Sequence, residues 1–230
     1  MSKNIPQDFF NEDMAQAYDE RNSKLSPIKE ALHFTVRLLL QDLPKDSKIL
    51  CVGAGTGSEI IWFAKVFPQW NFVALEPSES MLKVCKKRIT EEGLANQCKF
   101  VHGYIEDLPK QEKFSAILSL FVGDFVENTQ RIHFFQNMAS RLQKDGYLIH
   151  AEISYDLNSP QFPLMLEKWE EVQKLMGATP ESLTKLPHQL KEVLTVLPPS
   201  KTEEQIKQAG LDCPVQFFQT LMICGWFCKK

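Results

Sequence analysis

The sequence carries little net charge and no long apolar run. Its 26 basic and 29 acidic side chains leave a formal charge of −3, and this mildly acidic balance gives no electrostatic reason to expect nucleic-acid binding. The densest basic run, Lys83 to Arg88, is interpreted as the solvated face of a helix. No apolar stretch approaches the roughly 18 residues that cross a bilayer, and residues 1–13 lack the layout of a signal peptide. We therefore expect a cytoplasmic protein with neither membrane nor nucleic-acid partners.

Cysteine is sparse as well. The six cysteines are scattered among hydrophobic residues, and a chain of 230 residues can bury a core without covalent cross-links. Cys224 and Cys228 have no third ligand cluster near them, and the histidines show no paired metal-ligand spacing. We expect reduced thiols and no metal site.

Short apolar runs alternate with segments of helical periodicity. The runs are residues 48–52, 71–75, 99–102, 114–120 and 146–153, and the helical segments between them are 58–67, 78–92 and 132–142. Such alternation indicates βαβ units, and therefore a parallel sheet covered on both faces. Two further runs, 215–218 and 221–227, are joined by Gln219-Thr220 and predict an antiparallel closing pair. The expected fold is α/β: a doubly wound, mostly parallel seven-stranded Rossmann-like sheet with the last strand antiparallel.

The two ends of the chain depart from this alternation. An apolar stripe over Phe9, Phe10, Met14, Ala17 and Tyr18 precedes a polar break at 21–24 and a helix from Pro27 to about Leu40. After Ile153, a stripe over 162–176 predicts an inserted amphipathic helix, with a second one across 186–197 and a short one over 202–208. We divide the chain into an N-terminal helical cap (1–44), a cofactor-binding core (45–155), a helical insertion or lid (156–199), and the final helix and closing strands of the core (200–230).

The most informative segment is the glycine loop, Gly53-Ala54-Gly55-Thr56-Gly57, between the first strand and the first core helix. Glycines let the backbone turn sharply and let a ligand approach closely, and the helix that follows begins with free N–H groups. Glu76 ends the second strand, where an acid can accept both hydroxyls of a ribose. The pair predicts an adenosine site at the carboxyl edge of the sheet.

The glycine spacing separates two nucleotide classes. The dinucleotide fingerprint is G-x-G-x-x-G, but Ser58 stands where its last glycine would be, and the loop reads G-x-G-x-G. This disfavours a nicotinamide enzyme. With the acid after the second strand, the loop resembles motif I of the class I S-adenosylmethionine-dependent methyltransferases.

The resemblance is strong over about residues 45–153. It implies S-adenosylmethionine as cofactor and S-adenosylhomocysteine as product. Residues 100–109 resemble the family's segment after strand three, so Ile105 would pack on the adenine and Glu106 would lie near its amino group. The end of 114–121 would lie near the methionine part. The implied cofactor-binding set is Tyr18, Arg21, Gly53, Ala54, Gly55, Thr56, Gly57, Glu76, Pro77, Met81, Tyr104, Ile105, Glu106, Ser119, Leu120 and Phe121.

Residues 18–21, Tyr-Asp-Glu-Arg, resemble the Y-D-x-x-R segment that caps the cofactor in small-molecule methyltransferases and in carboxy-S-adenosylmethionine synthase relatives. Arg21 could pair with a carboxylate there. No catalytic residue is assigned. Asp124, Glu152 and Tyr155 lie where strands end, and His150 is expected deeper in the sheet as a structural histidine.

Absent motifs narrow the acceptor. The D/N-P-P-Y/F sequence of amino-group methyltransferases acting on nucleic acid or glutamine is missing after strand four, as is the Pro-Cys pair of cytosine-C5 enzymes, and residues 121–125 offer a largely apolar wall. We predict methyl transfer to a small-molecule acceptor. Two alternatives stay open: a carboxy-S-adenosylmethionine synthase-like enzyme, and a non-catalytic S-adenosylmethionine-binding subunit. The sequence does not determine the acceptor, the accepting atom or the oligomeric state.

Overall fold

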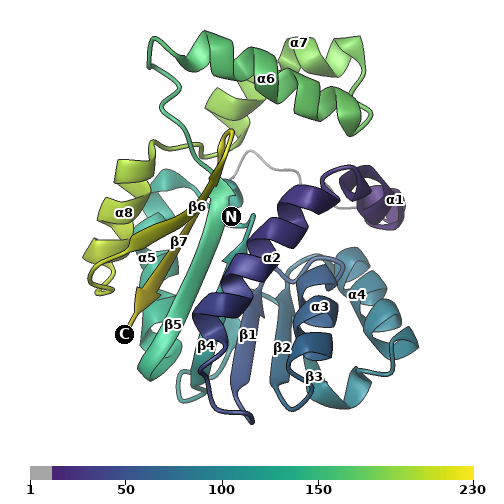
Figure 1. Ribbon diagram of the computed structural model, residues 1–230, viewed down its shortest axis with the longest axis vertical. Helices are drawn as coiled ribbons and strands as arrows, with labels where there is room; N and C mark the ends of the chain where they lie inside the picture. Colours follow the sequence, from purple (N-terminus) through teal and green to yellow (C-terminus); the bar gives the residue numbers. More distant parts are fainter. Residues whose placement is uncertain (1–11) are drawn as a thin grey trace.

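The computed structural model describes residues 12–230 and contains a seven-stranded sheet in the order β3-β2-β1-β4-β5-β7-β6 (Figure 1). The strands are β1 (Lys48–Val52), β2 (Asn71–Glu76), β3 (Cys98–His102), β4 (Phe114–Leu120), β5 (Leu142–Ile153), β6 (Val215–Thr220) and β7 (Ile223–Lys229). β1 to β5 pair in parallel, and β7 runs antiparallel to both β5 and β6. The predicted doubly wound sheet with an antiparallel last strand is confirmed.

Successive side chains of a β-strand point to opposite faces of the sheet. The side chains of β1 therefore pack alternately in two apolar layers, one on each face. Ile49 and Cys51 pack with α2, α3 and α4, whereas Leu50 and Val52 pack with α5 and α8 on the other face. The helices are α1 (Glu12–Ser23), α2 (Ser26–Leu40), α3 (Ser58–Val66), α4 (Glu79–Glu91), α5 (Asn128–Arg141), α6 (Phe162–Leu175), α7 (Pro180–His188) and α8 (Pro199–Gln208). Shorter helical turns are η1 (Ala95–Gln97), η2 (Ile105–Asp107), η3 (Gly123–Phe125) and the π-type η4 (Gln189–Val193).

Three local predictions were wrong. The polar break at 21–24 is helical as far as Ser23, because Asn22 and Ser23 hydrogen-bond back to carbonyl groups of the preceding turn. The helix predicted over 186–197 begins earlier, at Pro180, where the Thr179 side chain caps it, and gives way to η4. The closing turn lies at residues 221–222 because Thr220 still pairs with Ile223. Phe9 and Phe10 lie outside the described residues.

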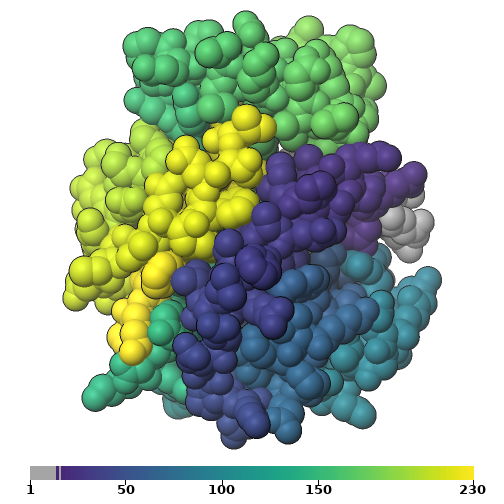
Figure 2. Space-filling model, viewed as in Figure 1, coloured from purple at the N-terminus to yellow at the C-terminus, as the bar shows by residue number. Residues whose placement is uncertain are grey.

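Helices α6, α7 and η4 form a separate layer beyond the carboxyl edge of the sheet, at the top of Figures 1 and 2. Their apolar side chains, including Phe162, Trp169 and Leu190, pack in one cluster with Met222 and Ile223 of the closing hairpin. Ser154, just after β5, pairs with Leu197 and fastens the end of this layer to the sheet. The insertion therefore stands where parallel sheets bind ligands. Within residues 12–230, no helix is both long and apolar enough to cross a membrane.

Candidate functional site

The glycine loop needs its glycines for two separate reasons. Gly53, Gly55 and Gly57 have φ angles of 65°, 53° and 79°, in the left-handed region that favours glycine. Space is short as well: a Cβ on Gly53 would lie 2.5 Å from Val122 Cγ2, and one on Gly57 would lie 2.8 Å from Cys85 Sγ. The loop thus lies directly against the segment after β4 and against α4.

Glu76 points into this loop from the end of β2. Its side chain is 6% exposed, and its Oε2 accepts a hydrogen bond from the Gly55 N–H at 2.9 Å. Its Oε1 accepts one from the Ser78 N–H, also at 2.9 Å. Burial raises the pKa of Glu76, although both hydrogen bonds act in the opposite direction. The carboxylate is fixed in one orientation with acceptor capacity to spare.

Helix α1 is fastened to the glycine loop and to α4 by a polar latch of Asp19, Thr56 and Arg88. Asp19 Oδ1 accepts a hydrogen bond from Thr56 Oγ1 at 2.7 Å, and its Oδ2 lies 2.9 Å from Arg88 Nη1. Arg88 Nη1 also donates to the Thr56 carbonyl oxygen at 2.9 Å. Beside Asp19, burial and the charge of Glu59 raise the pKa of Tyr18 to about 12.

Several other predicted residues gather around the loop. Ala54 is buried and its N–H donates to the Leu75 carbonyl oxygen at 3.0 Å. Met81, 3% exposed, lies beside Gly55, and Ile105, also 3% exposed, packs in the apolar cluster with Leu75. The Pro77 carbonyl oxygen lies 3.0 Å from His102 Nε2.

Three predicted residues have other surroundings. Arg21 is exposed, and its Nη1 lies 3.6 Å from Met14 Sδ. Glu106 is exposed and its Oε1 accepts a hydrogen bond from Asn137 of α5 at 3.0 Å. Tyr104 is 46% exposed. The pairing of Arg21 with a carboxylate stays a prediction, and so does the contact of Glu106 with an adenine amino group. The observed contacts of these two side chains support neither prediction.

The end of β4 bends sharply toward the loop. Phe121 has a φ of 58°, a left-handed conformation uncommon for a bulky residue, and its N–H donates to the Ala151 carbonyl oxygen at 2.7 Å. The bend brings Val122 against Gly53. Ser119 is fully buried, with its Oγ 3.2 Å from His150 Nδ1, and Leu120 is half-buried at the sheet edge.

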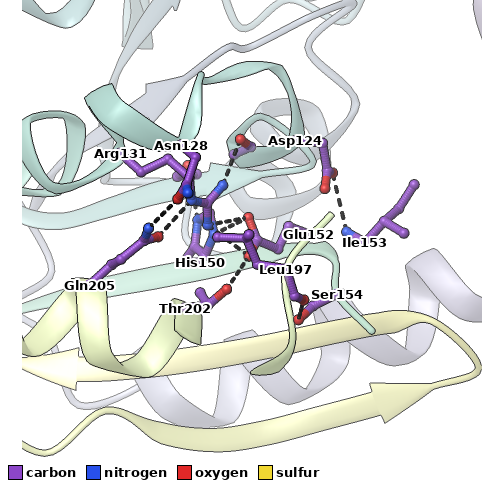
Figure 3. A network of polar contacts seen from close by, with 12 residues as sticks. Asp124, Asn128, Arg131, His150, Glu152, Ile153, Ser154, Leu197, Thr202 and Gln205 are labelled. Atoms are coloured by element: carbon purple, nitrogen blue, oxygen red, sulfur yellow. Dashed lines mark hydrogen bonds and ion pairs between the residues drawn. The ribbon is translucent and has the colours of Figure 1, made fainter. Parts of the chain in front are cut away.

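A buried charged network lies behind this bend, between β5, α5 and α8 (Figure 3). Arg131 Nη2 contacts both oxygens of Glu152 at 2.8 Å, and both side chains are 0% exposed. Thr202 Oγ1 donates to Glu152 Oε1 at 2.6 Å, and His150 Nε2 lies 3.0 Å from Glu152 Oε2. Burial opposes ionisation of Glu152, but Arg131 and His150 outweigh it and lower its pKa to about 2. Both candidate bases on β5 are thus engaged and closed to solvent.

Asp124 sits at the rim of this network. Its Oδ2 accepts a hydrogen bond from the Ile153 N–H at 3.1 Å, while its Oδ1 is buried without a partner in the described part of the chain. Burial and the neighbouring charge of Glu152 raise the pKa of Asp124 well above its ordinary value. Burial and the charge of Glu152 therefore both oppose ionisation of Asp124.

Sequence reasoning missed the cations of both clusters. Arg88 was assigned to a solvated basic run, although it is the one arginine among lysines and makes directed contacts with the loop. Arg131 stands on the buried face of α5 with Phe134, Phe135 and Met138. An arginine at core spacing in an amphipathic helix is the signal that could have found it.

Two hollows lie away from the loop. One of about 370 Å³ lies between the start of α5 and residues 191–197, and one of about 490 Å³ lies at the amino ends of β1, β2 and β3. Neither hollow is lined by a residue of the glycine loop. The assignment of the site therefore depends on the geometry of the loop and not on a large open cavity.

The strand order, the left-handed glycine loop and the buried acid after β2 define a nucleotide-binding α/β fold of the methyltransferase type. The methyltransferase domain family matches residues 49–146. The chain is 24% identical over 204 residues to a carboxy-S-adenosyl-L-methionine synthase of Nautilia profundicola, covering 87% of this chain and 85% of the relative. The corresponding enzyme of Campylobacter hominis is 23% identical over 96% of this chain and 94% of its own length.

The match over residues 49–146 and these relatives support an assignment to the class I S-adenosylmethionine-dependent methyltransferases. They support an enzyme with S-adenosylmethionine as cofactor, and S-adenosylhomocysteine is the product where the group transferred is methyl. Among solved structures, an O-methyltransferase family protein from Burkholderia thailandensis superposes with a TM-score of 0.68 over 98% of this chain at 10% identity. The chain spans 63% of that longer protein, and the likeness concerns the fold.

Proposed function

We propose that the protein transfers the methyl group of S-adenosylmethionine to a small organic acceptor. The observation that carries this proposal is the Glu76 carboxylate, buried and aimed at a loop of three left-handed glycines. An ionised carboxylate has about four acceptor positions, and backbone N–H groups take one on each Glu76 oxygen. The remaining positions fit the two hydroxyls of a ribose.

The surroundings also fit an adenosyl group. Gly55 presents bare backbone, and the nearest side-chain atom to a Cβ built there is Met81 Cε, at 3.7 Å. Met81 and Ile105 supply apolar surface on the side of β3, where a base would lie. When bound, S-adenosylmethionine supplies a methyl group that is already electrophilic, so the chain has to align the acceptor and exclude water.

The residues support catalysis by alignment of the acceptor with the methyl group of the cofactor. Held in near-attack geometry, two reactants can gain about 7–11 kcal/mol in the best cases. Glu152 is paired with Arg131, His150 Nδ1 lies 3.2 Å from Ser119 Oγ, and burial opposes ionisation of Asp124. We therefore propose transfer without a strong general base from β5. The helical insertion of residues 156–199 would close over an acceptor beside Phe121, Ile153 and Tyr155, which pack against its apolar cluster.

Calorimetry with S-adenosylhomocysteine tests the cofactor site. Glu76→Ala should weaken binding by at least about tenfold, because two hydrogen bonds to a charged group are lost. The matched control is Glu79→Ala, an exposed acid three residues away on α4. If Glu76→Ala binds as tightly as the control, Glu76 does not hold the ribose and the proposed site is wrong.

A second candidate, carboxyl attachment as in the carboxy-S-adenosyl-L-methionine synthases, is favoured by one observation: those relatives align with almost the whole chain. It requires a cation for the added carboxylate, and the candidate named for that role, Arg21, is exposed and next to Met14. Mass spectrometry of the ligand that copurifies separates the two reactions. The mass of the carboxylated cofactor would support the synthase, and S-adenosylmethionine or S-adenosylhomocysteine would support methyl transfer.

A further inference from the structure

The bend after β4, residues 121–124, lies directly against the glycine loop. Phe121 has a φ of 58°, and a residue other than glycine keeps such a conformation only where its surroundings hold it. Val122, the next residue, packs so closely on Gly53 that a Cβ on Gly53 would lie 2.5 Å from Val122 Cγ2. Relaxation of the bend would therefore move the surface against which the glycine loop rests.

Hydrogen bonds from two sides hold this bend. The Phe121 N–H donates to the Ala151 carbonyl oxygen of β5 at 2.7 Å. The Gly123 carbonyl oxygen accepts one hydrogen bond from the Val126 N–H at 3.0 Å and a second, at 2.7 Å, from Nη1 of Arg131. Arg131 is a charged donor, and hydrogen bonds from charged donors are about twice as strong as those between neutral groups. The middle of the bend is thus held by a side chain of α5.

Arg131 is itself fixed from three elements (Figure 3). Its Nη2 contacts both carboxylate oxygens of Glu152 on β5 at 2.8 Å, and its Nε donates to Gln205 Oε1 on α8 at 2.7 Å. On α5, its guanidinium carbon lies 5.5 Å from the centre of the Phe135 ring. These contacts leave the guanidinium one orientation, in which Nη1 meets the Gly123 carbonyl oxygen.

We propose that Arg131 is a positioning residue for the cofactor site. Because Gly123 follows Val122 directly, the hydrogen bond from Arg131 to the Gly123 carbonyl oxygen keeps Val122 against Gly53. A side chain that is 0% exposed thereby sets the affinity of the glycine loop for the cofactor. The proposal rests on the proposed function, since it concerns the same loop.

A double variant separates this role from support of the fold alone. Replacing both Arg131 and Glu152 by Met removes the buried cation together with its buried counter-charge, so urea unfolding should show a stability close to that of the wild type. The Gly123 carbonyl oxygen nevertheless loses its charged donor. Calorimetry should therefore show that S-adenosylhomocysteine binds at least about tenfold more weakly, as for one lost hydrogen bond to a charged group.

Thr202→Val is the matched control. It removes the 2.6 Å hydrogen bond to Glu152 but leaves the contact of Arg131 with Gly123, so S-adenosylhomocysteine binding should not change. Wild-type binding in a stable double variant, or an equal loss of binding in Thr202→Val, would overturn the proposal.

Arg131→Lys decides the question if the double variant does not fold. One ammonium group on a shorter stem does not reproduce a fork that contacts Gly123 and Glu152 at once. The expected loss of binding is of the same order, and unchanged binding in a folded Arg131→Lys variant would overturn the proposal. A wild type that does not bind S-adenosylhomocysteine would instead overturn the proposed function.

Discussion

Residues 12–230 contain two arginine–carboxylate clusters that share their chemistry but not their surroundings. In the latch, Arg88 and Asp19 are 31% and 33% exposed and join α1 to the glycine loop. In the network, Arg131 and Glu152 are both 0% exposed and join α5, β5 and α8. Water competes for the first pair and is excluded from the second, so the first can open at low cost while separation of the second leaves a bare charge in the core. The weak pair lies beside the glycine loop, and the strong pair lies between the sheet and its helices.

The network offers the largest effect. Arg131→Met should lower the free energy of unfolding by about 3–5 kcal/mol, because Glu152 is left buried without its main counter-charge. Urea unfolding followed by circular dichroism measures the loss. A second variant that also replaces Glu152 by Met should recover most of it, since no buried charge then remains. A loss in Arg131→Met no larger than that of an exposed arginine would show that the network is not a single electrostatic unit.

Asp124 and Glu152, both in the network, respond to pH in opposite directions. Glu152, with its pKa lowered to about 2, contributes stability that is present at neutral pH and is lost as pH falls toward about 2. Burial and the charge of Glu152 raise the pKa of Asp124, so stability is lost as pH rises above the ordinary pKa of an aspartate, about 4. Asp124→Asn should therefore gain stability over the wild type at neutral pH, and the gain should vanish as pH falls to about 4.

Denaturant unfolding across this pH range checks the expectation. Asp145→Asn is the control, because Asp145 is an exposed acid paired with Lys229 and should show no such gain. An Asp124→Asn variant that is less stable than the wild type at every pH would contradict the raised pKa of Asp124.

The latch offers the smallest effect on stability. Asp19→Asn should change the free energy of unfolding by about 0–1 kcal/mol, as expected for a partly exposed pair. S-adenosylhomocysteine should nevertheless dissociate faster, because α1 is held less firmly over the loop, and added salt should narrow the difference from the wild type. Stopped-flow dissociation measures this, with Glu20→Gln on the same helix as control. Equal rates for the two variants would show that Asp19 does not restrain α1.

Most of the sheet could be predicted because each strand is a local apolar run, as β1 and β4 illustrate. The loop and Glu76 were accessible for a related reason: glycine spacing and strand ends are local features of the chain. The latch and the network join residues distant in sequence. The helical spacing of Arg131 indicates a buried face of α5, but not which acid it meets, and its pairing with Glu152 is seen only once α5 lies against β5.

The closing hairpin has a consequence for how the chain acquires its structure. β7 runs between β5 and β6, and its Trp226 and Cys228 are buried in the core. Met222, at the tip of the hairpin, is buried under the helical insertion of residues 156–199. Neither the sheet nor the attachment of the helical insertion is complete until residues 222–228 are in place. During synthesis the edge of the sheet at β5 therefore stays open until residues 222–228 have left the ribosome.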